Sequence, residues 1–333
     1  MKIAVVGAGA IGGYLGGWLA AAGEDVTFIA RGKNLAAIQA HGMTVVGEDG
    51  KTVSAANVRV CERMADAGTQ DFVLLTVKAH QVSDVAGDLK HLCNADTAIV
   101  TMQNGIPWWY FQKHREFGGR PVLAADPDGS IGSAVDPARI IGSVVYPAAV
   151  LASPGVVHVV EGKRFTLGEL DGSKSPRIER ICAALIKAGF KSPVSDDIRA
   201  EIWLKVLGNL AFNPISALTH ATLVDLIQFP PTRELSMAMM REAEAIATRL
   251  GVTMRVGIEK RIAGAEKVGA HKTSMLQDVE AGRALEHEAL VGAVAELGRV
   301  VGIATPHIDA VLALTRLLAK TLADSRGKLA VSS

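Results

Sequence analysis

The stretch KIAVVGAGAIG, residues 2 to 12, indicates the fold of the first half of the chain. Residues 2 to 7 form a nearly continuous apolar run, as in a strand that is covered on both faces of a sheet. Glycines then interrupt the run, and helical spacing of apolar residues follows over residues 11 to 22. A buried strand that turns through glycines into a helix is typical of a parallel α/β sheet.

The same alternation continues to about residue 102. Further strand-like runs are DVTFIA (25 to 30), DFVLLTV (71 to 77) and TAIVTM (97 to 102), and helical spacing recurs over residues 33 to 41 and 81 to 92. This rhythm predicts an N-terminal Rossmann-type sheet, so the first fold class is α/β.

After about residue 115 the pattern changes to short strands broken by Gly, Pro and Asp. These are RPVLAA (120 to 125), IIGSVVYPAAVL (140 to 151), GVVHVV (155 to 160) and KRFTLGEL (163 to 170). Their alternation predicts antiparallel additions to the sheet edge. A helix over 177 to 188 and a short strand near Lys191 should complete this region.

From SPVSDD (192 to 197) onward no strand-like segment remains, and four or more helices are expected up to about residue 322. The prediction is therefore α/β plus all-α, with a Rossmann-like domain over 1–196 and an all-helical domain over 197–333. Ser195 to Asp197 supply N-cap candidates for the first helix of the second domain. The polar last ten residues, 324–333, are expected to fray.

Composition excludes several classes of function. The chain has 35 basic and 34 acidic residues among 333, so no global field attracts nucleic acid or an anionic membrane. No apolar run reaches the roughly 18 residues of a membrane span, and no signal peptide is apparent. Cys61, Cys93 and Cys182 have no CxxC spacing, which predicts buried free thiols and no metal site. A cytoplasmic protein is expected.

The glycine turn predicts a dinucleotide site. Gly7, Gly9 and Gly12 have G-x-G-x-x-G spacing between a strand and a helix. The first glycine permits the tight turn, the second lets the backbone approach a pyrophosphate, and the third allows close helix packing. We expect Gly7, Gly9, Ala10, Ile11 and Gly12 to contact the cofactor.

Residues at the end of the second strand favour NADP(H) over NAD(H). An NAD enzyme usually has Asp or Glu there, whereas this chain has Ala30 and then Arg31. A guanidinium would bind a 2'-phosphate, and Lys33 could assist it. Glu24 and Asp25 precede the strand, so they do not restore the NAD pattern.

Two further loops follow strands of the predicted sheet, at the carboxyl ends where ligands bind. TVKAHQ (76 to 81) carries Lys78 and Gln81, and TMQNG (101 to 105) carries Asn104. We expect these three side chains to line the nicotinamide side of a cleft.

The helical stretch EIWLKVLGNLAFNP, residues 201 to 214, carries a polar stripe of Lys205, Asn209 and Asn213 at i, i+4 spacing. Asn and Gly208 disfavour helix, so the stripe serves something other than helix stability. A Lys in a partly desolvated cleft could protonate the alkoxide that forms when a carbonyl accepts hydride. The two asparagines could hold the substrate in a polar cavity between the domains.

A second polar cluster lies in HKTSMLQDVEAGRALEHEAL (271 to 290). Ser274 begins a Ser-x-x-Gln pattern, so a structural helix cap is one interpretation of it. Glu286 opens the next helical run, where a helix dipole favours a carboxylate.

Taken together, GAGAIGG, VKAHQ, QNG, the K-x-x-x-N-x-x-x-N-P helix and SMLQD followed by R-x-x-E resemble the ketopantoate reductase family, the NADPH-dependent 2-dehydropantoate 2-reductases. The resemblance runs from residue 1 to about 320. It implies a Rossmann domain joined to a helical domain, with the active site between them.

The resemblance also implies roles for individual residues. Lys205 falls on the general acid, and Glu286 falls on the glutamate that orients the substrate. Ser274 falls on the serine that holds the substrate carboxylate, and Asn209 and Asn213 fall on the helix asparagines. Asn104 and Lys78 match cleft residues, and Arg31 matches the arginine at the adenosine phosphate. A small 2-oxo acid is the expected partner, and a homodimer is left open.

Two alternatives stay open at this stage. A β-hydroxyacid dehydrogenase of the 6-phosphogluconate dehydrogenase kind shares a K-x-x-x-N helix, but it opens with GLGxMG where this chain has GAGAIGG. A catalytically silent NADP-binding sensor would need neither Lys205 nor Glu286. The departures WWYF (108 to 111) and ALEHE leave the identity of the 2-oxo acid open.

Overall fold

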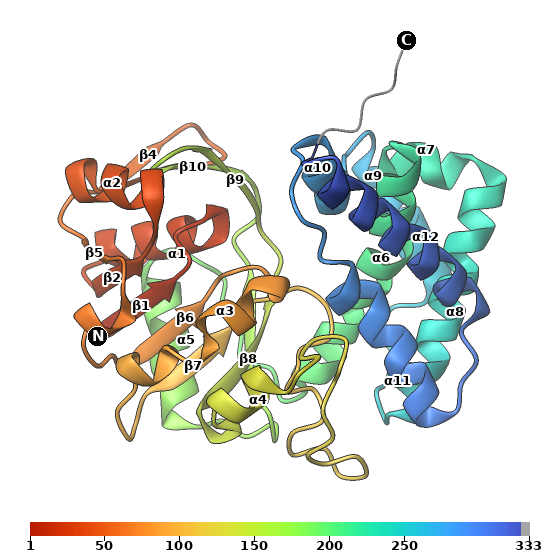
Figure 1. The fold of residues 1–333 in the computed structure, drawn as a ribbon, viewed down its shortest axis with the longest axis horizontal. Helices are drawn as coiled ribbons and strands as arrows, with labels where there is room; N and C mark the ends of the chain where they lie inside the picture. Colours follow the sequence, from red (N-terminus) through yellow and green to blue (C-terminus); the bar gives the residue numbers. More distant parts are fainter. Residues whose placement is uncertain (328–333) are drawn as a thin grey trace. The chain divides into compact units, whose positions relative to one another are not determined.

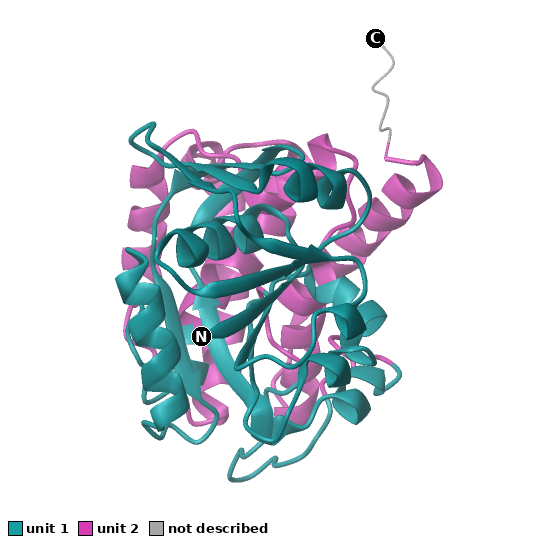
Figure 2. Ribbon diagram, turned by 90° about the vertical axis from the view of Figure 1, so that its left-hand side faces the viewer, with its two compact units in different colours: residues 1–103, 109–121, 128–201 teal, residues 104–108, 122–127, 202–333 magenta. Residues whose placement is uncertain are grey.

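A computed structural model describes residues 1–327 of the chain, and residue contacts divide it into two compact units (Figure 2). Unit 1 comprises residues 1–103, 109–121 and 128–201. Unit 2 comprises residues 104–108 and 122–127 and the chain from residue 202 onward. The division thus falls after Glu201 and assigns two short earlier segments to unit 2. Of the segment predicted to fray, residues 328–333 lie outside the described residues.

Unit 1 is built on a seven-stranded sheet with the order β11-β8-β7-β6-β1-β2-β5 (Figure 1). Its strands are β1 (Lys2–Val6), β2 (Asp25–Ile29), β5 (Arg59–Cys61), β6 (Phe72–Leu75), β7 (Ala98–Thr101), β8 (Ile140–Val145) and β11 (Phe165–Glu169). All neighbouring pairs are parallel except β8 and β11. The Rossmann-type prediction is confirmed, since the central strands β1, β6 and β7 are almost wholly buried.

Helices cover both faces of this sheet. They are α1 (Ala10–Ala21), α2 (Gly32–His41), α3 (Val82–Ala86), α4 (Ser130–Ala134) and α5 (Pro176–Lys187). Helices α1 and α5 share one buried core with the sheet, and α3 contacts α4. The helix predicted over 81–92 is broken: α3 lies between the 3-10 turns η2 (Ala79–Gln81) and η3 (Leu89–Leu92). Two more 3-10 turns are η1 (Met64–Asp66) and η4 (Pro137–Arg139).

A second, four-stranded sheet has the order β4-β3-β10-β9. Its strands are β3 (Met43–Val46), β4 (Thr52–Ala55), β9 (Ala148–Ser153) and β10 (Val156–Glu161). Helix α1 contacts both sheets, and its glycines make this possible. A Cβ on Gly16 would lie 2.4 Å from Phe28 of β2, and one on Gly17 would lie 2.7 Å from Val45 of β3.

Several sequence predictions for the middle of the chain are wrong. Strand β8 joins the sheet in parallel, and β9 and β10 belong to the second sheet, so only β11 is an antiparallel edge addition. Buried and exposed residues alternate in β10 because one face of the strand packs against α1 and the other faces solvent. Residues 120–125 form no strand, because the amides of Leu123 and Ala124 donate to the carboxylate of Glu296 at 2.8 and 2.7 Å. Near Lys191 there are only isolated bridges.

Unit 2 is helical in the described residues, as predicted. Its elements are α6 (Ile198–Thr219), whose first turn belongs to unit 1, and α7 (Leu223–Gln228), α8 (Pro230–Arg249), α9 (Ile258–Val268), α10 (Ser274–Glu280), the π turn η5 (Glu288–Gly292), α11 (Ala293–Val301) and α12 (Pro306–Asp324). Helix α6 continues through Pro214. The cysteines are free thiols, and of the three only Cys182 is fully buried.

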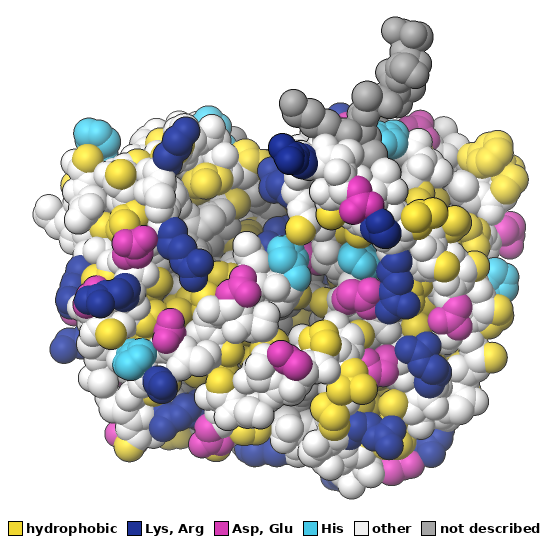
Figure 3. Space-filling view, viewed as in Figure 1, with side chains coloured by type: hydrophobic (Ala, Val, Ile, Leu, Met, Phe, Trp, Pro, Cys, Tyr) yellow, Lys and Arg dark blue, Asp and Glu magenta, His cyan; other side chains and the backbone are white. Residues whose placement is uncertain are grey.

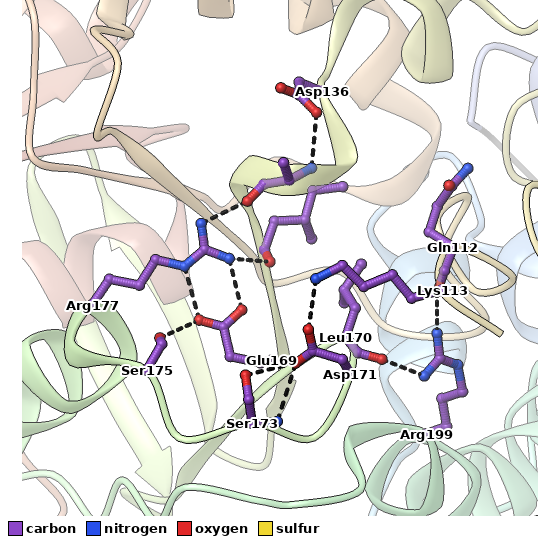
Figure 4. Close-up of polar contacts among 12 residues, drawn as sticks. Gln112, Lys113, Asp136, Glu169, Leu170, Asp171, Ser173, Ser175, Arg177 and Arg199 are labelled. Carbon is purple, nitrogen blue, oxygen red and sulfur yellow. Dashed lines mark hydrogen bonds and ion pairs between the residues drawn. The ribbon is translucent and has the colours of Figure 1, made fainter. Parts of the chain in front are cut away.

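The start of α6 is fixed within unit 1 by a network of polar contacts (Figure 4). Asp197 caps the helix by accepting from the amide of Ala200 at 3.0 Å, which confirms one of the N-cap candidates. Arg199 donates to the carbonyl oxygens of Tyr110 at 2.9 Å and Leu170 at 2.8 Å. Charge-assisted contacts of this kind are stronger than neutral ones, so the helix that carries Lys205 begins from a firmly held turn.

Candidate functional site

The turn between β1 and α1 accepts only glycine at two of its positions. Gly7 has a φ of +102°, and a Cβ there would lie 2.8 Å from Cγ1 of Val77. A Cβ on Gly12 would lie 2.0 Å from the carbonyl oxygen of Gly7. That carbonyl also accepts a hydrogen bond from Thr76 Oγ1 at 2.7 Å, which ties the turn to the end of β6.

Gly9 differs from its neighbours because the space beside it is open. Apart from its chain neighbours, no atom of the described residues lies within 4 Å of a Cβ built on Gly9. It is the N-cap residue of α1, and no side chain caps the helix there. Ala10 and Ile11 begin the first turn behind it. Uncapped amides at a helix N-terminus favour an anion, so the turn has the form of a phosphate site.

This turn opens into a cavity of about 710 Å³ in unit 1. The cavity is lined by residues at the carboxyl ends of β1, β2, β5 and β6, among them the predicted Gly7, Gly9, Arg31 and Gln81. Its volume lies within the usual range for small-molecule and cofactor sites. Open space at Gly9, the uncapped helix and the location at the strand ends all fit a dinucleotide.

Charges of both signs surround this cavity. Arg31 is exposed and is the N-cap residue of α2. Glu62 and Arg63 also line the cavity, but Arg63 is held by Asp66 through contacts of 3.0 and 2.7 Å. On the face drawn in Figure 3, basic and acidic side chains are likewise interspersed. Any attraction of a phosphate is therefore local.

The other predicted cofactor residues, Lys78, Gln81 and Asn104, have different surroundings. Gln81 accepts from the backbone amide of Lys78 at 3.2 Å, which holds the 3-10 turn η2 together. Lys78 is partly buried, but it is not among the lining residues. Asn104 belongs to unit 2, where it contacts Lys205.

Sequence reasoning missed other residues of the cavity wall. Asn34 accepts from the amide of Gly155 at 2.7 Å and donates to the carbonyl of Ala8. Glu62 was missed because it follows β5, a strand that was not predicted. Three more polar lining residues, Asp84, Asp88 and His91, recur at helical spacing within the predicted helix over 81–92, and that spacing could have revealed them.

In unit 2, one narrow part of α6 is accessible. Between residues 200 and 217 the helix is buried except at Leu204, Lys205, Gly208 and Asn209. Among the described residues outside the backbone of α6 itself, a Cβ on Gly208 would approach only Nη1 of Arg261, at 3.8 Å. Gly208 and Asn209 disfavour helix, but because they are small and polar they leave an open polar strip beside Lys205.

Within this strip, Lys205 is the titratable residue, and its pKa is shifted. Its Nζ donates to Oδ1 of Asn104 at 2.6 Å. Burial lowers the pKa of Lys205 from 10.5 to about 8, and the negative charge of Glu286 opposes part of that shift. Glu286 is itself buried and immediately precedes the helical run that begins at His287. A Lys with a pKa near neutrality can hold a proton and release it.

The two asparagines of the stripe have different surroundings. Asn209 is partly exposed, and its side chain has no hydrogen-bond partner among the described residues. Asn213 is buried, and its Nδ2 donates to Oγ of Ser274 at 3.4 Å. The structure thus joins the stripe on α6 to the cluster at 271–290.

The interpretation of Ser274 as a helix cap is wrong. Thr273 is the N-cap residue of α10, and its Oγ1 accepts from the amide of Leu276 at 3.3 Å. Ser274 is the first helical residue and is exposed. Sequence favoured the wrong hydroxyl because Ser-x-x-Gln fits a capping box, whereas Thr273 begins no such pattern.

Two features of the described residues concern membranes and metal ions. Within residues 1–327 no helix combines the length and the apolarity that a bilayer span requires. Nor do these residues include three or more His, Cys, Asp or Glu side chains grouped so that they could hold a metal ion.

Comparison with known proteins gives a consistent result. Residues 3–172 match the family described as ketopantoate reductase PanE/ApbA, and residues 197–319 match its C-terminal part. A Mesorhizobium japonicum protein named 2-dehydropantoate 2-reductase is 51% identical over 323 residues, which is 96% of this chain and 98% of that protein.

Solved structures extend the comparison to the fold. One from Ralstonia solanacearum MolK2 has a TM-score of 0.92 and 39% identity, and the match covers 97% of this chain and 98% of that one. D-mandelate dehydrogenase with NADH and anilino(oxo)acetate has a TM-score of 0.82 over 97% of this chain and 100% of that one. Its 23% identity shows a shared fold alone.

Proposed function

The chain belongs to the ketopantoate reductase family, and on that premise we propose that it reduces 2-dehydropantoate, or a similar branched 2-oxo acid, to the 2-hydroxy acid with NADPH. The family makes it an oxidoreductase. The observation that carries the proposal is the polar cluster on α6, in which Lys205 contacts Asn104 and has a pKa of about 8 beside Glu286.

In this proposal Lys205 is the general acid. A bound nucleotide would supply hydride to the carbonyl carbon, and the substrate oxygen would then need a proton. The Nζ of Lys205 holds that proton, and Asn104 orients the ammonium by accepting one of its hydrogens. Glu286 keeps the pKa of Lys205 high enough for the proton to be present near neutral pH.

The remaining polar residues would hold the substrate. Asn209 lies one turn from Lys205 and can donate to the oxo acid. Asn213 holds the hydroxyl of Ser274 from one side, which leaves the hydroxyl proton of the serine to donate to the substrate carboxylate.

Cofactor choice rests on Arg31. The pyrophosphate would lie at the open turn of Gly9 and the N-terminus of α1. Arg31 lines the same cavity directly after β2, where it can pair with a 2'-phosphate. We therefore assign NADPH in preference to NADH.

The test is a screen of NADPH oxidation over 2-dehydropantoate and related 2-oxo acids. The proposal expects turnover with at least one branched 2-oxo acid and none with linear 3-hydroxy acids in the reverse direction. Turnover restricted to 3-hydroxy acids would instead favour a β-hydroxyacid dehydrogenase. Tight NADPH binding with no turnover on the whole panel would favour the silent sensor.

A further inference from the structure

A π turn separates Glu286 from the regular helix that follows it. Residues Glu288–Gly292 form η5, and α11 continues from Ala293. A π turn holds one more residue than an α-helical turn, and it frequently occurs at functional sites. This geometry is less regular than an α-helix, and the contacts that keep it come from its neighbours in the fold, α12 and residues 104–106.

An ion pair between Arg316 and Glu288, here called the clamp, lies against Gly292 of this turn. Arg316 of α12 donates from Nε and Nη2 to the two carboxylate oxygens of Glu288, at 2.7 and 2.8 Å. His287 Nε2 lies 3.3 Å from the same carboxylate. A Cβ on Gly292 would lie 2.2 Å from Oε2 of Glu288. The carboxylate thus lies against the backbone of the turn, in space that a side chain at residue 292 would take from it.

The next residue of the turn, Ala289, contacts the segment that carries Asn104. The carbonyl of Ala289 accepts from the amide of Ile106 at 2.9 Å. Gly105 has a φ of +90°, and a Cβ there would lie 2.3 Å from the carbonyl oxygen of Ala289. The backbone of residues 104–106 is therefore in close contact with the π turn.

The turn consequently connects both groups that act on Lys205. Glu286 lies just before it in the chain, and Asn104 is held on it through Gly105 and Ile106. We propose that Glu288 and Arg316, closed over Gly292, are positioning residues that hold this turn and so set Glu286 and Asn104 against Lys205. The inference rests on the proposed function for its kinetic part.

The exposure of the clamp indicates that it holds the π turn in place more than it stabilises the whole fold. The side chains of Arg316 and Glu288 are 52% and 37% exposed, and ion pairs this open contribute little to unfolding free energy. Burial alone would raise the pKa of Glu288, but hydrogen bonds from Arg316 and His287 outweigh it and lower the pKa to about 2. The clamp is thus charged across the working pH range.

A first experiment measures amide hydrogen exchange in Arg316→Gln. The matched control is Lys320→Gln, which removes a cation one turn further along α12. We expect exchange of the Ile106 amide to rise roughly tenfold in Arg316→Gln and to stay unchanged in Lys320→Gln. Equal exchange in both variants overturns the proposal. This readout needs no substrate, so it decides the matter even if the unmodified protein reduces no 2-oxo acid.

A second experiment uses kinetics in a double-mutant cycle. Arg316→Gln should lower kcat for the best 2-oxo acid roughly tenfold without changing NADPH affinity, and Arg316→Lys should recover part of the loss. Gly292→Ala should resemble Arg316→Gln, because the new methyl group displaces the Glu288 carboxylate. In a Glu286→Gln background the added loss from Arg316→Gln should be small. Fully additive losses would show that the clamp acts independently of Glu286.

Discussion

The glycine turn in the cavity of unit 1 acts through its backbone, whereas the polar cluster of unit 2 is made of side chains. Gly7, Gly9 and Gly12 lie within one turn, and each acts by lacking a side chain. The cluster brings Asn104 and Glu286 to Lys205, and Ser274 to Asn213 on the same helix, although these residues are far apart in the chain. Substitutions that add a side chain should therefore impair the glycine turn, and substitutions that remove a side chain should impair the polar cluster.

The largest effect is expected from Lys205→Ala. Loss of a general acid usually lowers turnover by roughly a hundredfold to ten-thousandfold. NADPH affinity should stay nearly unchanged, because the cavity lies within unit 1. Steady-state kinetics and a nucleotide titration measure the two quantities, with thermal unfolding as the control for folding. A well-folded variant with undiminished reduction of its best 2-oxo acid would refute the assignment.

The next largest effect concerns nucleotide preference, which we assign to Arg31 in unit 1. Arg31→Ala should remove most of the preference for NADPH over NADH, because one charge-assisted phosphate contact contributes roughly tenfold to a hundredfold in affinity. NADH affinity should change little. Titration of both nucleotides against both proteins gives the answer, and equal affinities in the unmodified protein would contradict the cofactor assignment.

Two alanine substitutions in the glycine turn should separate binding from folding. Gly9→Ala meets no atom, so unfolding should be unchanged while nucleotide affinity falls roughly tenfold, since the methyl group occupies space beside the uncapped helix end. Gly12→Ala forces a contact of 2.0 Å with backbone, so the protein itself should lose stability. Thermal unfolding and NADPH titration distinguish the variants, and similar melting temperatures for both would count against this view of the turn.

Sequence predicted the two regions with different success, for a physical reason. The glycine turn is contiguous, and its spacing directly reflects the geometry that a phosphate requires. The stripe of Lys205 and Asn209 was also predictable, because helical periodicity fixes which residues share a face. What lies opposite that face depends on long-range packing. The contact of Asn104 with Lys205 and that of Asn213 with Ser274 could be suggested only through family resemblance.

Errors in the fold follow the same distinction. The second sheet pairs β3 with β10, two segments more than a hundred residues apart, and no local pattern specifies that pairing. Residues 120–125 have strand-like composition, but their amides bind a carboxylate from α11. Glu62 was missed with β5 for the same reason, since a short edge strand has a weak pattern.

A pH profile tests the electrostatic part of the side-chain site. The proton donor must be protonated, so kcat/KM should fall as pH rises through about 8, the pKa of Lys205. Glu286 opposes the lowering of this pKa by burial, so Glu286→Gln should move the fall to lower pH, by roughly one unit. Profiles of both proteins with the same 2-oxo acid show the shift. A fall at unchanged pH would mean that Glu286 does not act on Lys205.

The smallest effects distinguish two adjacent hydroxyls at the start of α10. Thr273 caps the helix, so Thr273→Ala should lower the free energy of unfolding by about 1 kcal/mol and leave KM for the oxo acid nearly unchanged. Ser274 is exposed, and among residues 1–327 its side chain is hydrogen-bonded by Asn213 alone, so Ser274→Ala should leave stability within about 0.5 kcal/mol. If Ser274 donates to the substrate carboxylate, KM should rise roughly threefold to tenfold. Denaturant unfolding and steady-state kinetics on this pair measure both effects, and a KM unchanged in Ser274→Ala would remove the serine from the substrate site.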